Sequence, residues 1–530
     1  MTISGKTIPV VDLFAGPGGL GEGFSSVMDS NGNRRFEIRL SIEKDLFAHQ
    51  TLLLRAIFRM FPRFRAPECY YDYLRGEIDR QKLFKSPEMN EALQLARQET
   101  RCVTLGEHPV EVVDQWIEKV IGNHNEWVLI GGPPCQAYST AGRSRMRKRD
   151  PTTFEKDERH FLYKEYLRII RKFRPGVFVM ENVKGLLSST HGGSLIFTKI
   201  REDLSRPESD LEYEIRSFVR TIGTPKPGDF IIGSENHGIP QRRHRVILFG
   251  VRSDLADRPN RTLVWQTDRV SVRDMIYGMP PIRSRISRGK DSFDNWINAL
   301  RDTPIFLRNW TDPKRNEIEE LMARAINQAR FITDIGGRFM KVSNFTGGNV
   351  PMELINWILD PRIKGFCQHE ARSHMREDLH RYLFAACHAQ VFKVSPKLNE
   401  FPLELSPAHK NLNAVEVPFD DRFRVQCWDL PATTVMSHMA KDGHYFIHPD
   451  PRQCRSMTLR EAARLQTFPD NYFFEGSKTQ QYTQVGNAVP PYLAKQIAQI
   501  VADFIEVNSE QNPPAHFCAL SNKNWNKTVL

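Results

Sequence analysis

The sequence predicts an α/β fold in which an open sheet is interrupted by an inserted domain of mixed structure. Three observations predict this class. Short apolar runs of strand length alternate with segments of helical periodicity through the first 250 residues. Each run ends at small or reactive residues, as strands do at the ligand-binding edge of such sheets. After about residue 252 the alternation stops, and it returns near residue 458.

Individual elements follow from the apolar pattern. Leu162, Tyr166, Ile169 and Phe173 recur at helical spacing, and the segment Thr458-Leu459-Arg460-Glu461 is a capping box that opens a later helix. Pro490-Pro491 begins a final amphipathic helix. The predicted strands cover residues 8–14, 36–42, 127–130, 177–180 and 246–251.

The change of pattern sets the predicted domain organisation. Between about residues 270 and 430, basic and aromatic residues are mixed without clear alternation, which indicates a separate domain. We expect one α/β domain formed by residues 1–265 and 435–510, an insertion at 266–434, and a polar tail at 511–530.

Composition excludes several classes of protein. The chain has 530 residues, of which 40% are hydrophobic and 26% charged, so it is neither disordered nor collagenous. No apolar run reaches the roughly 18 residues of a membrane span. The net charge of +11 favours a polyanionic partner such as nucleic acid. Its eight cysteines are scattered without a Cys-x-x-Cys pair, which is typical of a protein from a reducing compartment.

A glycine-rich turn follows the first strand. Residues 16–21 match the pattern G-x-G-x-x-G, and Glu43 stands at the end of the next strand. Such glycines let the backbone approach a ligand, and the carboxylate can hold ribose hydroxyls. The motif alone fits NAD, FAD or S-adenosylmethionine equally, and roughly half of bare matches are only tight turns.

Reactive side chains follow the third and fourth strands. Cys135 comes after a strand and two prolines, and Glu181 ends the next strand. An isolated cysteine is usually a small buried hydrophobe. Here, however, a thiol, a carboxyl group and the basic run at residues 241–245 are predicted at one sheet edge, which favours a nucleophilic site.

A metal centre is a weaker hypothesis. The spacings fit no common zinc pattern, and residues 370–386 are predicted to form a helix, so we expect no metal. The residues concerned are Cys367, His369, His374, His380, Cys387 and His388.

Six motifs in order resemble those of DNA (cytosine-5)-methyltransferases of the prokaryotic, restriction-modification type. They span residues 10–505, and their number and order make the resemblance specific. They are Asp12-Leu13-Phe14-Ala15-Gly16, Pro133-Pro134-Cys135-Gln136, Glu181-Asn182-Val183, Gln241-Arg242-Arg243-His244-Arg245, Arg460-Glu461-Ala462-Ala463-Arg464-Leu465-Gln466 and Gly486-Asn487-Ala488-Val489.

The resemblance implies a Rossmann-like methyltransferase domain with an inserted target-recognition domain. It implies methyl transfer from S-adenosyl-L-methionine to carbon 5 of a cytosine flipped out of a specific duplex DNA sequence. Cys135 would add to carbon 6 and Glu181 would hold the ring edge. Arg243 and Arg245 resemble the arginines that contact the base and position the loop.

The resemblance also carries over binding residues. The adenine-side motif is unclear, with Leu105-Gly106-Glu107 as the best candidate. For the cofactor, the expected residues are Phe14, Ala15, Gly16, Gly18, Gly19, Leu20, Glu43, Pro134, Asn487 and Val489. For DNA, they are Gln136, Ser139, Arg143, Arg145, Arg147, Lys148, Gln241 and Thr434, where the basic loop could instead be only a solvated charged surface.

Partners and alternatives complete the prediction. We expect a monomer that acts on double-stranded DNA and does not associate with a membrane. We expect it in the cytoplasm of a prokaryote, at the nucleoid, with a cognate restriction endonuclease as a possible partner. The alternatives are an RNA (tRNA) cytosine-5 methyltransferase, a non-catalytic DNA-binding homologue, and a dinucleotide-dependent oxidoreductase. The first would carry a Cys-Phe-Thr tripeptide that this chain lacks, and the other two leave Cys135 and Glu181 without a role.

Overall fold

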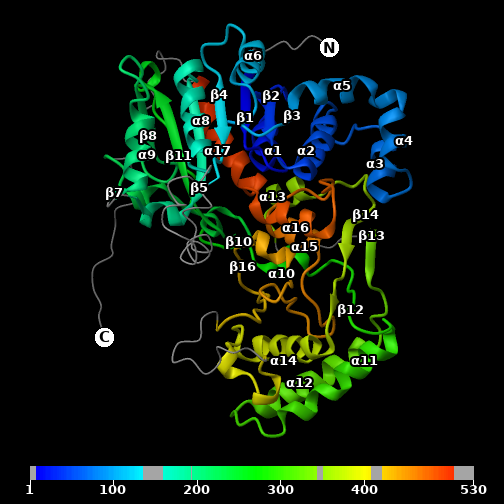
Figure 1. The fold of residues 1–530 in the computed structure, drawn as a ribbon. Helices are drawn as coiled ribbons and strands as arrows, with labels where there is room; N and C mark the ends of the chain where they lie inside the picture. The colour runs from blue at the N-terminus through cyan, green and yellow to red at the C-terminus, as the bar shows by residue number, and fades with distance from the viewer. Residues whose placement is uncertain are drawn as a thin grey trace.

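A central sheet organises the molecule (Figure 1). The computed structural model describes residues 7–134, 159–191, 194–221, 223–342, 350–407 and 420–506. Within them the sheet has eight strands in the order β3-β2-β1-β4-β5-β11-β8, and β9 pairs with β11. The strands are β1 (Ile8–Leu13), β2 (Phe36–Glu43), β3 (Thr100–Cys102), β4 (Val128–Gly131), β5 (Val177–Val183), β8 (Tyr213–Arg216), β9 (Ile231–Gly233) and β11 (His244–Arg252).

Strand direction divides the sheet into two regions. The five strands from β3 to β5 are mutually parallel, whereas β11 runs antiparallel to β5, β8 and β9. The N-terminal end of β11 therefore lies at the same edge as the C-terminal ends of β1, β2, β4 and β5. All five strands expected from the sequence are present, and the predicted α/β class is confirmed.

Helices cover both faces of the sheet. Val10 and Val11 are both fully buried but belong to different hydrophobic clusters, because successive strand residues point to opposite faces. The first cluster includes α1 (Gly19–Ser25) and α17 (Pro491–Glu506), which pack against each other. The second includes α6 (Val110–Ile121), α8 (Arg159–Phe173) and α9 (Ile196–Ser205). Beside α9, β6 (Thr190–His191) pairs with β7 (Ser194–Leu195).

Four helices between β2 and β3 form a unit that the sequence pattern did not predict. They enclose a hydrophobic cluster that also includes Ile363, Cys367 and Phe473 from distant parts of the chain. We call this unit the helical insert. Its members are α2 (Leu46–Arg59), α3 (Glu68–Arg75), α4 (Arg80–Lys85) and α5 (Asn90–Glu99).

The lower part of the molecule in Figure 1 has a core of its own. This core draws on residues 296–454, so segments on both sides of residue 434 contribute to it. We call residues 285–456 the inserted part. Its elements are β12 (Arg285–Ile286), α11 (Phe293–Asp302), α12 (Arg315–Ala329), β13 (Gly336–Lys341), α13 (Met352–Ile358), β14 (Gly365–Glu370), β15 (Ser373–His374), α14 (Arg376–Phe392) and β16 (Ala432–Thr433).

The helix expected at residues 370–386 begins later than predicted. Glu370 instead ends β14, which pairs antiparallel with β13, and residues 373–374 pair with β12. These partners come from 30 to 90 residues earlier in the chain, so pairing across the fold overrides the local preference for helix. Only from Arg376 onward is the prediction correct.

Short elements join the two parts of the molecule. They are α10 (Val272–Ile276), β10 (Gln241–Arg242), α15 (Leu459–Leu465) and α16 (Lys478–Asn487). Strand β10 pairs with β16. The predicted capping box is present, because Thr458 accepts from the Glu461 amide and the Glu461 carboxylate accepts from the Thr458 amide. Within the described residues, no helix is long and apolar enough to cross a membrane.

Candidate active site

An ion pair marks the edge of the sheet between β5 and β11. Oε1 of Glu181 lies 2.9 Å from Nε of Arg245, and the two side chains are 14% and 16% exposed. Arg245 is opposite Val183 in the antiparallel register, which brings a residue 62 positions later beside the end of β5. The pair is therefore held by two strands, yet it remains open to a ligand.

The loop after β4 begins against this pair. A Cβ atom at Gly132 would lie 3.0 Å from Oε2 of Glu181, so glycine permits the close approach. The Asn182 side chain donates to the Pro133 carbonyl at 3.4 Å, which ties β5 to the same loop. Pro134 is the last described residue here. Cys135 and the predicted DNA contacts that follow it lie outside the described residues, namely Gln136, Ser139, Arg143, Arg145, Arg147 and Lys148.

Arg243 does not occupy the position expected of a base contact. Its side chain is 1% exposed, and its guanidinium donates to the carbonyls of Val435 at 2.9 Å and Gly486 at 3.1 Å. Burial lowers the pKa of Arg243, and the neighbouring Arg245 acts in the same direction. Arg243 thus fastens β11 to two later segments of the chain and acts as a positioning residue.

Gln241 is likewise enclosed rather than available to DNA. It is completely buried, and its amide donates to the Leu465 carbonyl at 3.2 Å and accepts from the Val435 amide at 2.6 Å. The expectation of a DNA contact at Gln241 is therefore corrected. Thr434 is partly exposed, and its hydroxyl donates to the Arg242 carbonyl at 2.6 Å. Thr434 and the exposed Arg242 form the outer rim of this edge.

The glycine-rich turn after β1 has the backbone geometry of a ligand cradle. Phe14, Gly16 and Gly18 all have positive φ angles, and a Cβ at Gly16 would meet no atom within 4 Å. The Gly16 amide donates to Oε2 of Glu43 at 2.8 Å, and the Asp45 amide donates to Oε1 at 2.7 Å. Burial raises the pKa of Glu43. The turn and Glu43 therefore lie together, as the sequence predicted.

Residues near the C-terminus close one side of this turn. A Cβ at Gly19 would lie 2.4 Å from the Val489 carbonyl oxygen, so only glycine fits there. Leu20 and Val489 are both 7% exposed and share one hydrophobic cluster, which leaves mainly their backbones to face a cofactor. Asn487 is exposed on the same segment. The structure thus brings together predicted cofactor residues that are 470 positions apart.

Asp12 is a residue of this region that the sequence analysis did not select. It is completely buried in β1 beneath α1, and a Cβ at Gly21 would lie 3.1 Å from its Oδ2. Burial raises the pKa of Asp12 to about 8, and nearby Glu99 and Glu43 act in the same direction, against Arg59. The signal in the sequence was the single charged residue inside an otherwise apolar strand.

Other predicted positions fall into two groups. Leu105, the candidate on the adenine side, is buried just after β3, at the same edge of the sheet as Glu43. His369 and His374 instead have structural partners, since their rings bond to the Thr458 and Ser456 hydroxyls. Among the described residues, no group of three or more potential ligands could hold a metal ion.

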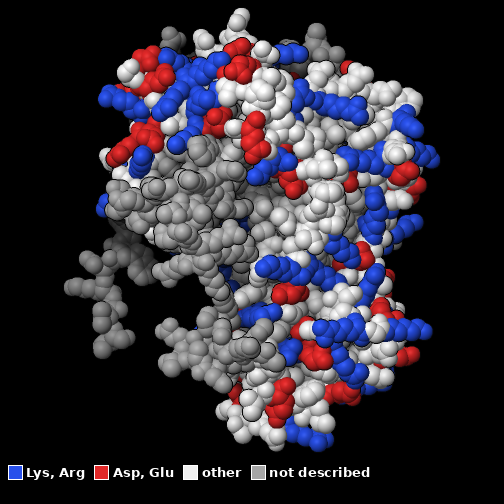
Figure 2. Space-filling model, viewed as in Figure 1, with Lys and Arg blue, Asp and Glu red and all other residues white. Residues whose placement is uncertain are grey.

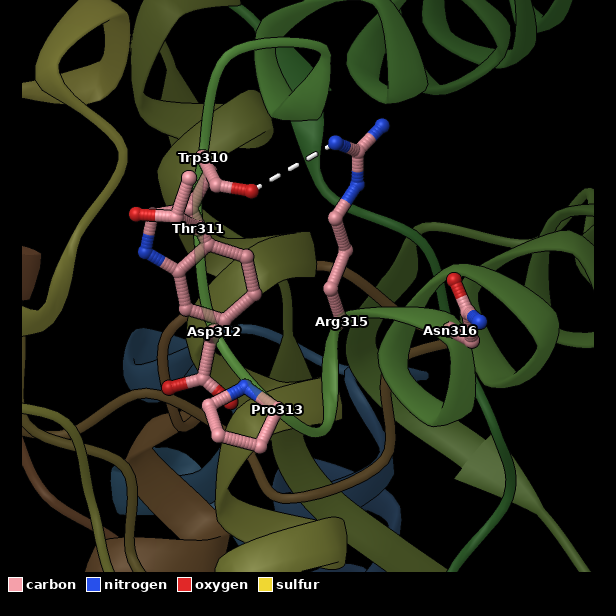
Figure 3. Close-up of a pocket in the computed structure, with 6 residues that line it drawn as sticks. All are labelled: Trp310, Thr311, Asp312, Pro313, Arg315 and Asn316. Carbon is pink, nitrogen blue, oxygen red and sulfur yellow. Dashed lines mark hydrogen bonds between the residues drawn. The ribbon is translucent and has the colours of Figure 1, made fainter.

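One described cavity lies in the inserted part rather than at this edge. It has a volume of about 460 Å³ and occupies the connection before α12, where Arg315 donates to the Trp310 carbonyl (Figure 3). Its remaining lining residues are Thr311, Asp312, Pro313 and Asn316. It holds a single carboxylate and no thiol or histidine, so we place the chemistry at the sheet edge instead.

Comparison with known proteins agrees with this geometry. A family model described as C-5 cytosine-specific DNA methylase matches residues 102–502, from the end of β3 into α17. The chain belongs to this family. The resemblance inferred from the motifs is therefore confirmed, and the protein is a DNA (cytosine-5)-methyltransferase.

Relatives of this methyltransferase match along most of its length. The Type II methyltransferase M.Bpa9945I of Bacillus paralicheniformis is 34% identical over 515 residues, which cover 94% of this chain and 99% of the relative. M.AgeI of Thalassovita gelatinovora, also a Type II methyltransferase, is 28% identical over 71% of this chain and 82% of its own. The DNA (cytosine-5-)-methyltransferase M.ApeKI of Aeropyrum pernix is 25% identical over 72% and 81%, respectively.

Proposed function

We propose that this enzyme methylates carbon 5 of a cytosine that is flipped out of a specific duplex DNA sequence, through a covalent bond between Cys135 and carbon 6. The observation that carries the proposal is the Glu181–Arg245 ion pair against Gly132, three residues before Cys135. The target atom is inaccessible within a stacked duplex, so the base must leave the helix.

Two side chains are suited to the activation of the cytosine ring. The Cys135 thiolate adds to carbon 6 while the Glu181 carboxyl group hydrogen-bonds N3 and the exocyclic amine, so that electron density moves to carbon 5. Carbon 5 would then take the electrophilic sulfonium methyl group of S-adenosylmethionine, and cleavage of the sulfur–methyl bond would release S-adenosylhomocysteine. Loss of the carbon 5 proton to a base then returns the electron pair to the ring, and the sulfur–carbon 6 bond breaks.

Arg245 and Arg243 have different parts in this scheme. Arg245 orients the Glu181 carboxyl group through the 2.9 Å contact, and its positive charge favours the thiolate form of a nearby cysteine. Arg243 holds the start of β11 against the carbonyls of Val435 and Gly486, which keeps Arg245 in place. Arg245 is therefore the guanidinium that we assign to the site.

The glycine-rich turn fits S-adenosylmethionine. The open space at Gly16 lets the backbone approach the amino-acid portion, and Glu43 lies at the end of β2, where a carboxylate can accept from ribose hydroxyls. Phe14, Pro134 and Asn487 would line the same space, with Leu105 on the adenine side. The close contact of Gly19 with Val489 forms its inner wall.

The cellular role follows from the relatives. Two of the enzymes compared above are named Type II methyltransferases, so we propose a role in restriction-modification, with a cognate endonuclease or as an orphan modification enzyme. Because chromosomal DNA is the proposed substrate, the enzyme acts in the cytoplasm, at the nucleoid. We propose that it acts as a monomer.

Trapping the covalent intermediate tests this mechanism. The target sequence is first found by sequencing methylated DNA from cells that express the protein. A duplex with 5-fluorocytosine at the target should then form a denaturation-resistant adduct with the wild-type enzyme and S-adenosylmethionine, because fluorine cannot leave as a proton does. Cys135→Ser should form no adduct and transfer no methyl group while still binding DNA. Near-normal turnover by Cys135→Ser would overturn the assignment of the nucleophile.

The ring-binding role of Glu181 has its own test. Glu181→Gln should lower kcat by at least about 100-fold, because an amide cannot supply the proton that makes the ring electrophilic. Glu202→Gln, the same change at an exposed position on α9, is the matched control. Equal rates for both variants would remove Glu181 from the reaction.

A further inference from the structure

A second cavity lies where the inserted part meets α16. Its volume is about 270 Å³, and three of its lining residues are cationic: Arg285 in β12, Arg372 next to β15, and Lys478 at the start of α16. Ser373 and Thr479 add hydroxyl groups to the same wall. We call this cavity the cationic pocket. Its three cations come from segments that are more than 80 residues apart in the sequence.

The pocket carries more positive charge than its surroundings neutralise. Glu370 is the carboxylate that pairs here, and its Oε1 lies 3.0 Å from Arg285 and 2.9 Å from Lys478. Three cations against one shared carboxylate leave a surplus of two positive charges. Arg372 has no carboxylate within ion-pair distance among the described residues. Its guanidinium instead lies 3.7 Å from the centre of the Tyr482 ring.

The geometry of these groups suits a tetrahedral anion. Stacking on Tyr482 fixes the plane of the Arg372 guanidinium, so its donors are already oriented before a ligand arrives. Ser477 is the N-cap of α16, which places Lys478 and Thr479 in the first turn. The free amide groups and dipole of that turn favour negative charge in addition to the side chains.

The pocket lies close to the proposed active site along the chain. Thr434 stands at the rim of the site, and Ala440 lines the pocket six residues later, at the end of the 3-10 turn Ser437–Ala440. Six residues span at most about 21 Å, which corresponds to about six base-pair steps of duplex DNA. Figure 2 shows Lys and Arg side chains across the waist between the two parts of the molecule.

We infer that the cationic pocket binds one backbone phosphate of the substrate duplex, within about six base pairs of the flipped cytosine. The inference rests on the proposed function, because it assumes that duplex DNA occupies the site beside Thr434. The contact positions the duplex and carries no sequence information. Arg372 and Lys478 are therefore positioning residues for the reaction.

Neutralising the pocket tests the inference by DNA binding rather than by turnover. Arg372→Gln/Lys478→Gln should weaken binding of a 30-base-pair duplex about tenfold and reduce the slope of log K against log salt concentration by about 1, the value for one phosphate. The matched control is Lys82→Gln/Lys85→Gln, which removes two exposed lysines of α4 and so makes the same change of charge outside the pocket. An unchanged salt slope in the double variant would overturn the inference.

Ethylation of single phosphates locates the contact. Removing the negative charge at one phosphate should weaken wild-type binding at a position within about six base pairs of the target, and the double variant should be insensitive to ethylation at that position. A change in folding alone would weaken binding without this positional match. Interference at no position, or the same position in both proteins, would contradict the inference.

A free anion is the alternative occupant. If inorganic phosphate at millimolar concentration raises the Tm of the wild type but not of the double variant, while DNA salt slopes stay equal, the pocket binds free phosphate and not the duplex backbone. Because these measurements need no methyl transfer, the Cys135 adduct experiment can fail independently of them. Loss of the adduct with intact positional interference would reject the mechanism and keep the pocket.

Discussion

The fold buries Asp12, although a carboxyl group is more easily ionised when it is exposed to water. A carboxyl group buried without a hydrogen bond is costly in its charged form. Neither oxygen of Asp12 has a hydrogen-bond partner within the described chain. The nearby Arg59 favours the charged form less strongly than burial opposes it. The pKa of about 8 therefore means that Asp12 is mostly protonated in the folded enzyme at neutral pH.

This burial predicts a particular pH dependence of stability. The folded pKa of about 8 lies above the unfolded value of about 3.9, so the folded state holds the extra proton between these limits. The free energy of unfolding should fall as pH rises through that window, by at most about 1.4 kcal/mol per pH unit. Asp12→Asn should remove this slope, so the variant gains stability relative to wild type between pH 5.5 and pH 7.5.

Urea unfolding at both pH values measures the change. Asp268→Asn, at an exposed position, is the control and should keep the wild-type slope. A difference between Asp12→Asn and wild type that does not vary with pH would contradict the prediction.

At the level of elements, the sequence predicted individual helices and strands better than it predicted which elements pack against one another. The strands and α8, α15 and α17 were predictable because apolar spacing and capping residues are local signals. The helical insert was not, because its buried face is completed by residues near 363 and 473. The position of Arg243 was equally hidden, since its partners are carbonyls of residues 192 and 243 positions later.

The candidate site was likewise predictable from the sequence only in part. The sequence predicted Glu43 at the strand end that follows the glycine turn, and Glu181 at one sheet edge with the basic run that contains Arg245, because strand ends gather at one edge. It could not separate residues that face a ligand from residues that fasten the framework. Gln241 and Arg243 stand in the same motif as Arg245, and only their burial against later segments shows that their role is structural.

The packing of α1 on α17 predicts the effect of one added methyl group. A Cβ at Gly23 would lie 2.4 Å from the Ala494 Cβ and from the Lys495 amide nitrogen. Gly23→Ala should therefore lower the free energy of unfolding by about 1–3 kcal/mol, because the helices must separate. Gly228→Ala is the control, since a Cβ there meets no atom within 4 Å. Equal Tm values for the two variants would show that α17 is not packed as described.

At the level of the whole molecule, the helical insert links the sheet to the inserted part. Arg362 donates to the Phe64 carbonyl at 3.1 Å and to the Glu68 carboxylate at 2.7 Å, and its guanidinium lies 4.3 Å from the centre of the Tyr71 ring. Tyr71 in turn donates to Asp360 at 2.9 Å. Figure 1 shows α3 beside β13 and β14, and α3 packs on β13. The insert is thus a second connection between them.

Removing this connection should loosen the insert without unfolding the enzyme. Arg362→Met should lower the free energy of unfolding by about 1–3 kcal/mol, because it leaves backbone carbonyls without donors. Amide hydrogen exchange should rise in residues 60–99 more than in the sheet. Arg324→Met is the control, because Arg324 is exposed on α12 and pairs there with the exposed Glu320. Uniform exchange across the chain in Arg362→Met would argue against a local connection.

The close packing of α17 on α1 bears on how the protein is made. About 470 residues separate α1 from α17. At about 5–20 residues per second, α17 is therefore made about 25–90 s after the helix on which it packs. Until α17 has been made, we expect the apolar face of α1 to stay exposed in the nascent chain, a condition in which chaperones usually bind. Truncated products would then lack a complete methyl-donor cavity, so that only finished molecules could modify DNA.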